Sequence, residues 1–144
     1  ITEICSILSI ETNIPSLTKS YLKDFSQLDQ INTIEEFIEI TKTFPPSSWL
    51  DKSLETFWKG SPSSAGVILE QLKRGRRLSL KEAFESELNL SVHCSLKPDF
   101  QEGIRALLID KDQTPRWTPA VHADVTQEWI ASYFTPLEGL KLFP

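Results

Sequence analysis

The chain has 144 residues, of which 40% are apolar and 24% are charged. This composition predicts a globular domain and excludes disordered and collagen-like proteins. No apolar run approaches the ~20 residues that a membrane-spanning helix needs, so we expect a soluble protein with no membrane partner. Its 15 basic and 20 acidic side chains give a net charge of −5. That balance argues against a nucleic-acid partner, which requires a basic surface.

Two helical patterns open the chain. The first has apolar residues at the spacing of one helix face and is already present at the first residue. Together with the absence of an initiator Met, this predicts a fragment or a processed chain. Pro15 fits the first turn of the second helix. The apolar positions are Ile1, Ile4, Cys5 and Leu8 in the first pattern and Leu17, Tyr21, Phe25 and Leu28 in the second.

Capping residues and helix breakers divide the next segment into three predicted helices. Thr33 and Glu36 have the spacing of a capping box, and Ser47 or Ser48 can cap the helix that follows. Gly75 stands where the third helix ends. The predicted ranges are 33–44, 47–60 and 62–75.

Residues 79–96 carry two competing signals. Ser79 and Glu82 form a second capping box, and the apolar residues behind them keep helical spacing. Residues 88–96 also alternate strictly between apolar and polar, as a half-buried strand does. We favour a helix, because the glutamates and the alanine in front of the alternation are weak strand formers.

The last predicted elements are short. Asp99 and Glu102 stand near the positive end of a helix that begins after Pro98. Asp124 or Thr126 can cap a final amphipathic turn or two. The predicted ranges are 98–108 for the helix, 110–119 for a loop, 126–134 for the final turns and 135–144 for a tail.

Two segments imitate ligand-binding loops without the residues that such loops need. Residues 60–66 are rich in glycine and serine, but they lack the lysine and the spacing of a phosphate-binding loop. Asp110 and Asp112 could open a calcium loop, but Pro115 and Val121 stand where that motif needs its glycine and its glutamate. We therefore predict no metal site.

The chain offers no recognisable catalytic group. Cys5 and Cys94 are its only cysteines, so we expect a reducing, intracellular compartment, with a disulfide between them as the alternative. His93 is expected to be a hydrogen-bonded packing residue, because sequence neighbours on a helix point about 100° apart and it cannot pair with Cys94. His122 falls in a predicted loop. The glutamates that share helix faces are expected to be solvated, namely Glu35, Glu39, Glu82 and Glu85.

Residues 73–77, KRGRR, carry four positive charges in five positions. The favoured interpretation is that they complement the negative end of a helix dipole. An anion-binding patch is the alternative.

The second half of the chain resembles a known family. Over ELNLSVHCSLKPDFQEGIRALLIDKDQTPRW, residues 87–117, it is similar to the C-terminal end of the 3-hydroxyisobutyryl-CoA hydrolases of the crotonase (enoyl-CoA hydratase/isomerase) superfamily. Upstream, Ser61-Pro62-x-Ser64 resembles the S-P-T-S helix of these enzymes, and residues 33–38 resemble the segment before it. The matching motifs are Asp99-Phe100, Glu102-Gly103, Arg105-Ala106, Ile109-Asp110-Lys111-Asp112 and Pro115-x-Trp117.

The resemblance implies an all-α fold, the C-terminal helical segment of a crotonase-type (ββα) enzyme whose core is absent from this chain. Its implied parts are a helical segment at 1–60, crotonase-type helices at 61–134 and a tail at 135–144. The full-length enzyme would hydrolyse the thioester of a short branched hydroxyacyl-CoA in valine catabolism, without a cofactor. Its oxyanion hole and water-activating acids would lie in the missing core, so we assign no catalytic residue here and expect this chain alone to be inactive.

Lys111 matches the lysine that the wider superfamily often places against the phosphates or adenine of CoA. The resemblance therefore implies that Lys111 binds substrate, and a structural loop charge is the other interpretation. The implied partners are an acyl-CoA and the missing N-terminal core, with a homo-oligomer left open. The implied compartment is the mitochondrial matrix in a eukaryote or the cytoplasm in a bacterium. The helices would cover the CoA site or support assembly, and the alternative function is a noncatalytic interaction or scaffold module.

Overall fold

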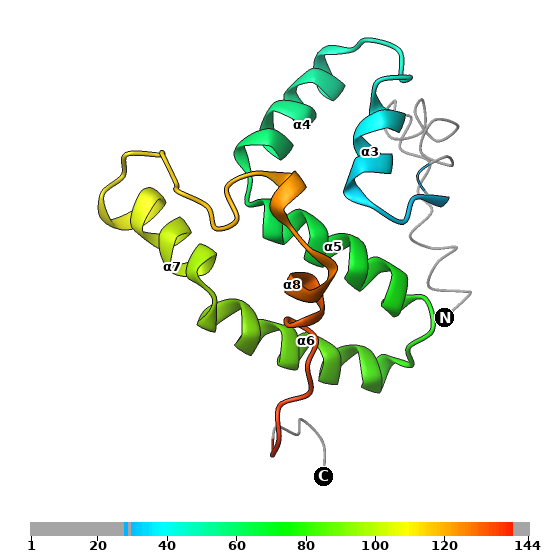
Figure 1. The fold of residues 1–144 in the computed structure, drawn as a ribbon, viewed down its shortest axis with the longest axis vertical. Coiled ribbons are helices and arrows are strands. Elements are labelled where there is room, and N and C mark those ends of the chain that lie inside the picture. The colour runs from blue at the N-terminus through cyan, green and yellow to red at the C-terminus, as the bar shows by residue number, and fades with distance from the viewer. Residues whose placement is uncertain (1–27, 29, 140–144) are drawn as a thin grey trace, which may run out of the picture. The chain divides into compact units, whose positions relative to one another are not determined.

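The computed structural model describes residues 28 and 30–139 (Figure 1). Asn32–Pro144 forms one compact unit, and every contact given below lies within its described part. Of the two helical patterns expected at the start of the chain, all positions except Leu28 lie outside the described residues, and so does Cys5. So does the end of the expected tail, residues 140–144.

Helices make up the regular structure of the described residues, which contain no strand. This confirms the predicted all-α fold. In chain order the elements are α3 (Ile34–Thr41), α4 (Ser48–Lys59), α5 (Pro62–Gly75), α6 (Leu80–Leu96), α7 (Pro98–Ile104), the π-helical turn η2 (Arg105–Ile109), the 3-10 turn η3 (His122–Asp124) and α8 (Gln127–Ala131).

A side-chain hydroxyl caps the start of five of these helices. Each hydroxyl accepts a hydrogen bond from a backbone N–H in the first turn, which has no partner inside the helix. The capping residues are Thr33, Ser47, Ser61, Ser79 and Thr126. The predicted capping box of Ser79 and Glu82 is complete.

Residues 88–96 belong to α6, so the helical interpretation of the alternating segment is confirmed. Three boundaries differ from the prediction, and one of them is the end of the final turns, which were expected to reach residue 134 but end with α8 at Ala131. α3 ends at Thr41 instead of Phe44, because the chain tightens into turns in which the Thr43 and Phe44 N–H groups bond to carbonyls three residues back. After Ile104 the expected α-helix widens into η2, whose last bond joins the Asp110 N–H to the Arg105 carbonyl at 2.8 Å.

The core lies where α5, α6 and α8 meet. Val67, Leu90, Ile130 and Tyr133 are buried there, one or two from each side of the contact. α8 lies close against α5 because Gly66 has no side chain, and a Cβ at that position would be 2.6 Å from Ile130 Cδ1. Figure 1 shows the chain returning over α5 and α6 to form this contact after the long loop that follows α7.

Candidate functional site

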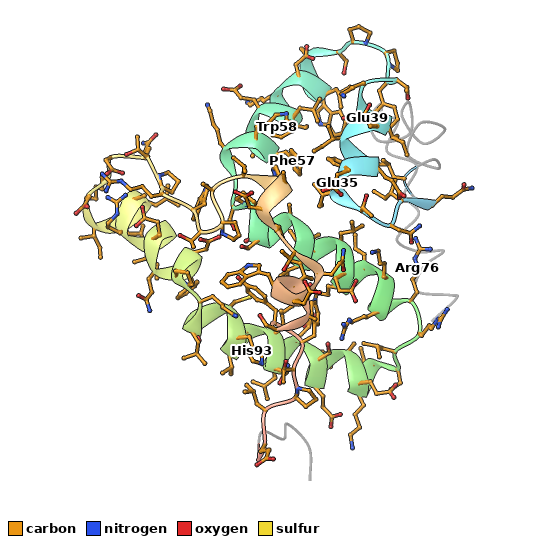
Figure 2. The ribbon with its side chains drawn as sticks, viewed as in Figure 1. Glu35, Glu39, Phe57, Trp58, Arg76 and His93 are labelled. Atoms are coloured by element: carbon orange, nitrogen blue, oxygen red, sulfur yellow. The ribbon has the colours of Figure 1, made fainter. Side chains whose placement is uncertain are left out.

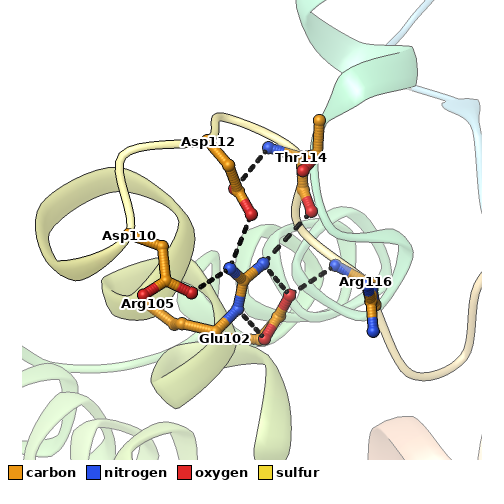
Figure 3. A network of polar contacts seen from close by, with 6 residues as sticks. All are labelled: Glu102, Arg105, Asp110, Asp112, Thr114 and Arg116. Carbon is orange, nitrogen blue, oxygen red and sulfur yellow. Dashed lines mark hydrogen bonds and ion pairs between the residues drawn. The ribbon is translucent and has the colours of Figure 1, made fainter.

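Four residues of the family resemblance, Glu102, Arg105, Asp110 and Asp112, meet beside the loop after η2 (Figure 3). Arg105 lies at the centre, where its Nη1 donates to Asp110 Oδ2 at 2.6 Å and to Asp112 Oδ2 at 2.7 Å. Its Nε and Nη2 donate to the two carboxylate oxygens of Glu102, at 2.9 and 2.7 Å. Nη2 also reaches the Thr114 carbonyl at 3.2 Å. One guanidinium thus ties the end of α7 to both sides of the loop.

Two backbone N–H groups complete this Arg105 network. The Thr114 N–H donates to Asp112 Oδ1 at 2.9 Å, and the Arg116 N–H donates to Glu102 Oε1 at 2.7 Å. Both carboxylates therefore bind the guanidinium and the backbone at the same time. The loop is shaped by these bonds, since its residues 111–117 have no regular secondary structure.

Lys111 stands between the two aspartates of this network. Its backbone is left-handed, with φ 56°, and Gln113 has φ 55°. That region costs a residue other than glycine roughly 1–2 kcal/mol, so the surrounding bonds must hold it. The Lys111 side chain is exposed, and none of the described residues forms a hydrogen bond or an ion pair with its ammonium. The loop presents this cation to the outside.

The charges of the network stabilise one another. Hydrogen bonds from the Arg105 guanidinium, followed by the bond from the Arg116 N–H, lower the pKa of Glu102 to about 2. Bonds from Arg105 and then from the Thr114 N–H lower the pKa of Asp112 to about 2. The acids in turn raise the pKa of Arg105, with Glu102 the largest cause. These groups are all ionised at neutral pH.

A second carboxylate network lies at the start of α7. Asp99 is only 8% exposed, and it accepts a 2.5 Å bond from the Ser61 hydroxyl and a 2.7 Å bond from the Thr118 N–H. The Trp117 indole N–H donates to the Lys59 carbonyl at 2.9 Å. This Asp99 network, made of Asp99, Ser61 and Thr118, joins the start of α7 to the start of α5 and to the end of the loop.

The basic cluster at residues 73–77 is engaged in local contacts. Arg74 donates to Glu70 at 2.8 Å and lies 4.2 Å from the centre of the Phe134 ring. Lys73 donates to the Asn32 carbonyl. The end of α5, where Arg76 is labelled in Figure 2, lies at the opposite side of this unit from the yellow loop after α7 in Figure 1. The cluster and Lys111 therefore do not form one site.

His93 and Cys94 serve packing. His93 Nε2 lies 2.8 Å from the Thr135 carbonyl oxygen, which confirms it as a hydrogen-bonded packing residue. Cys94 is a free thiol packed against the core, and burial raises its pKa. A thiol with a raised pKa is a poor nucleophile at neutral pH, because the thiolate is the reactive form.

His122 packs against the aromatic rings of Phe57 and Trp58 near the end of α4. Figure 2 labels these two aromatic residues. His122 stacks on Phe57 with ring centres 4.6 Å apart and meets Trp58 edge-on at 5.4 Å. Burial lowers its pKa. A cleft of about 40 Å³ beside it is lined in part by Glu35 and Lys73. Ligand pockets usually measure at least roughly 300 Å³, so this cleft suits water and not an acyl-CoA.

Of the glutamates expected to be solvated, Glu35, Glu39 and Glu82 are exposed and Glu85 is half-buried. Glu39 pairs with Lys42 at 2.5 Å, and Glu82 accepts bonds from Ser79 as its capping partner. Within the described ranges, no three His, Cys, Asp or Glu side chains are grouped so as to hold a metal ion. No helix there has the length and apolar character to cross a bilayer.

Sequence reasoning named Lys111 but missed what holds it. The sequence interprets Asp99 and Glu102 as favourable charges near a helix start and as residues of the family resemblance, and it gives Arg105 no role beyond that resemblance. The three-residue spacing of Glu102 and Arg105 is a signal of a helical ion pair that was available in the sequence. Asp99 had no such signal, because its partners lie 38 and 19 positions away.

The sequence profile of the enoyl-CoA hydratase/isomerase family matches residues 6–134. A relative named 3-hydroxyisobutyryl-CoA hydrolase, mitochondrial, from Dictyostelium discoideum is 38% identical over 130 residues, covering 88% of this chain and 34% of the relative. The protein of that name from Homo sapiens is 42% identical over 111 residues, covering 77% of this chain and 28% of the relative. A solved enoyl-CoA hydratase from Rhodobacter sphaeroides 2.4.1 matches with a TM-score of 0.73 and 28% identity.

The structural match covers 83% of this chain and 35% of the hydratase. This chain therefore spans about a third of the length of the proteins that it matches. The family profile extends over most of the 144 residues, and the sequence relatives cover the same region. The chain belongs to the enoyl-CoA hydratase/isomerase family.

Proposed function

We propose that this chain is the C-terminal helical part of an acyl-CoA thioester hydrolase that acts on 3-hydroxyisobutyryl-CoA in valine catabolism. The observation that carries the proposal is the similarity along most of the chain to relatives of that name, at 38% and 42% identity. The reaction adds water to the thioester and releases a free carboxylic acid and the CoA thiol. Because those relatives are named mitochondrial, the proposed compartment in a eukaryote is the mitochondrial matrix, and in a bacterium it is the cytoplasm.

The proposed role of Lys111 is to bind a phosphate or the adenine of CoA. CoA carries several phosphate charges, and a lysine ammonium attracts them as a point charge. An exposed ammonium at the tip of a shaped loop supports this role. The alternative, that Lys111 is only a loop charge, predicts no difference between CoA thioesters and thioesters without phosphates.

An exposed apolar surface supports a larger protein body as the partner. Phe100 on α7 and Leu107 and Leu108 on η2 are each more than half exposed. Exposed apolar side chains that lie near one another are typical of contact regions. In the proposal the occupant is the crotonase core. A scaffold module would show the same surface, so the two functions must be separated by activity.

The first test compares residues 1–144 alone with the same residues joined to a crotonase core, using release of the CoA thiol from 3-hydroxyisobutyryl-CoA as the signal. We expect thiol release only from the joined protein, because the described part of this chain carries no activated nucleophile or metal site. A joined, folded protein that binds but never cleaves the thioester would favour the scaffold function. Cleavage by the isolated chain, if lost in Cys94→Ala, would instead reveal a catalytic thiol.

The second test uses Lys111→Ala in the joined protein with two substrates, the CoA thioester and the pantetheine thioester that lacks the nucleotide phosphates. A phosphate contact predicts that only the CoA substrate is used less well, by roughly 1.5–3 kcal/mol in kcat/KM. Lys52→Ala is the control, since Lys52 is an exposed lysine on α4, outside the loop. Equal losses on both substrates would return Lys111 to a structural role.

A further inference from the structure

We propose that Arg105 is a positioning residue for CoA recognition, which acts through Lys111. The proposal rests on the proposed function, because it assumes that Lys111 meets the CoA nucleotide. Arg105 itself cannot be the contact. Its guanidinium is occupied by three carboxylates and one carbonyl, all within the loop and the helix beneath it.

The geometry that carries this inference is the closed loop of bonds around Lys111. The residues on either side of it, Asp110 and Asp112, both bind Nη1 of the same guanidinium. Because Asp110 and Asp112 are both bound to Arg105 Nη1, the backbone of Lys111 between them turns outward. This pair of bonds also holds Lys111 in its left-handed conformation, which a free chain would leave. Without Arg105 the ammonium would lose its fixed position.

Charge gives Arg105 a second effect on the same lysine. A phosphate that approaches Lys111 also approaches the two neighbouring aspartates. In the structure their Oδ2 atoms are bound to the guanidinium, which offsets their repulsion. If Arg105 were neutral, the phosphate would meet two carboxylates whose charge no guanidinium offsets.

A lysine at position 105 could supply the charge but not the geometry. The arginine makes five hydrogen bonds from three nitrogens, in a planar arrangement that an ammonium cannot reproduce. Arg105→Lys therefore separates the two effects. It keeps the neutralisation of the aspartates and loses most of the bonds that shape the loop.

The test is a double-mutant cycle in the joined protein, residues 1–144 with a crotonase core. KM and kcat are measured for the CoA thioester and for the pantetheine thioester. We expect Arg105→Gln to raise the KM for the CoA substrate roughly ten- to hundredfold, like Lys111→Ala, with kcat almost unchanged and the pantetheine substrate unaffected. The double variant should be no worse than either single one, since both changes remove the same contact. Arg105→Lys should give an intermediate KM, and it replaces Arg105→Gln if that variant does not fold.

Lys42→Ala serves as the matched control, because it breaks the exposed 2.5 Å ion pair with Glu39 at the end of α3. If Lys111→Ala raises the KM and Arg105→Gln does not, the inference fails and the proposed function stands. Effects that multiply in the double variant would also overturn it, because Arg105 would then act independently. Equal losses on both substrates would make Arg105 purely structural. If neither variant discriminates between the substrates, the proposed CoA contact falls together with the inference.

Discussion

Two carboxylate networks lie at the two ends of the segment that begins with α7, and they differ in burial and in partners. Asp99 is almost fully buried and is bound by a hydroxyl and a backbone N–H. Glu102 and Asp112 lie nearer the surface and are bound by Arg105. A buried carboxylate that loses its donors is costly, whereas exposed ion pairs contribute little to stability. The Asp99 network therefore holds the fold, and the Arg105 network shapes a loop.

Asp99→Ala tests the buried side of this comparison and should have the largest effect. It leaves the Ser61 hydroxyl and the Thr118 N–H without their acceptor, so we expect a loss of about 3 kcal/mol in the free energy of unfolding, measured in urea. Asp99→Asn should lose less, because its amide oxygen still accepts one bond. Glu55→Ala, which removes an exposed carboxylate, should change almost nothing. A loss in Asp99→Ala as small as that control would contradict the structural role of Asp99.

Gly66→Ala tests how closely α5 and α8 pack in the core. The new Cβ would lie 2.6 Å from Ile130 Cδ1, so we expect destabilisation of about 2 kcal/mol by overpacking. Ile130→Val removes that δ carbon and should relieve part of the loss in the double variant. Gly75→Ala is the control, since nothing lies within 4 Å of its Cβ, and it should stabilise by up to about 1 kcal/mol. Stabilisation by both alanines would show that the two helices are less closely packed than described.

The pH dependence of the Arg105 network tests whether the guanidinium holds Glu102 and Asp112. Glu102 and Asp112 have pKa values of about 2, below their ordinary values of 4.5 and 3.8. Their contribution is therefore complete above pH 4.5 and is lost as the pH falls toward 2. We expect carboxyl-carbon NMR titrations of both residues to have midpoints near 2. Midpoints near their ordinary values would mean that the guanidinium does not hold them.

His122 lies outside both networks and should show the smallest effect. Burial lowers its pKa below the ordinary 6.5, although Glu35 acts in the opposite direction. The unfolded chain therefore takes up the proton first, and stability should fall slightly as the pH drops below 6.5. In thermal unfolding between pH 7.5 and 5, His122→Phe should flatten that slope. An unchanged slope in the variant would assign it to other groups.

The sequence predicts local features of this molecule well. Capping boxes and helical spacing correctly locate the helices from Thr33 onward and assign residues 88–96 to a helix. The π turn after Ile104 was not predicted, because it depends on a bond made at its end by Asp110. Lys111 could be identified from the resemblance of the chain to the family. Its left-handed backbone could not, since that conformation depends on a guanidinium that binds both of its neighbours.

The most direct measurement of the proposed function is a comparison of two reactions catalysed by the full polypeptide. One is release of the CoA thiol from 3-hydroxyisobutyryl-CoA, and the other is hydration of an enoyl-CoA, the reaction named by the hydratase that matches this fold. A hydrolase should release the thiol and leave the double bond of the enoyl-CoA intact. Hydration of the double bond with the thioester preserved would contradict the assignment.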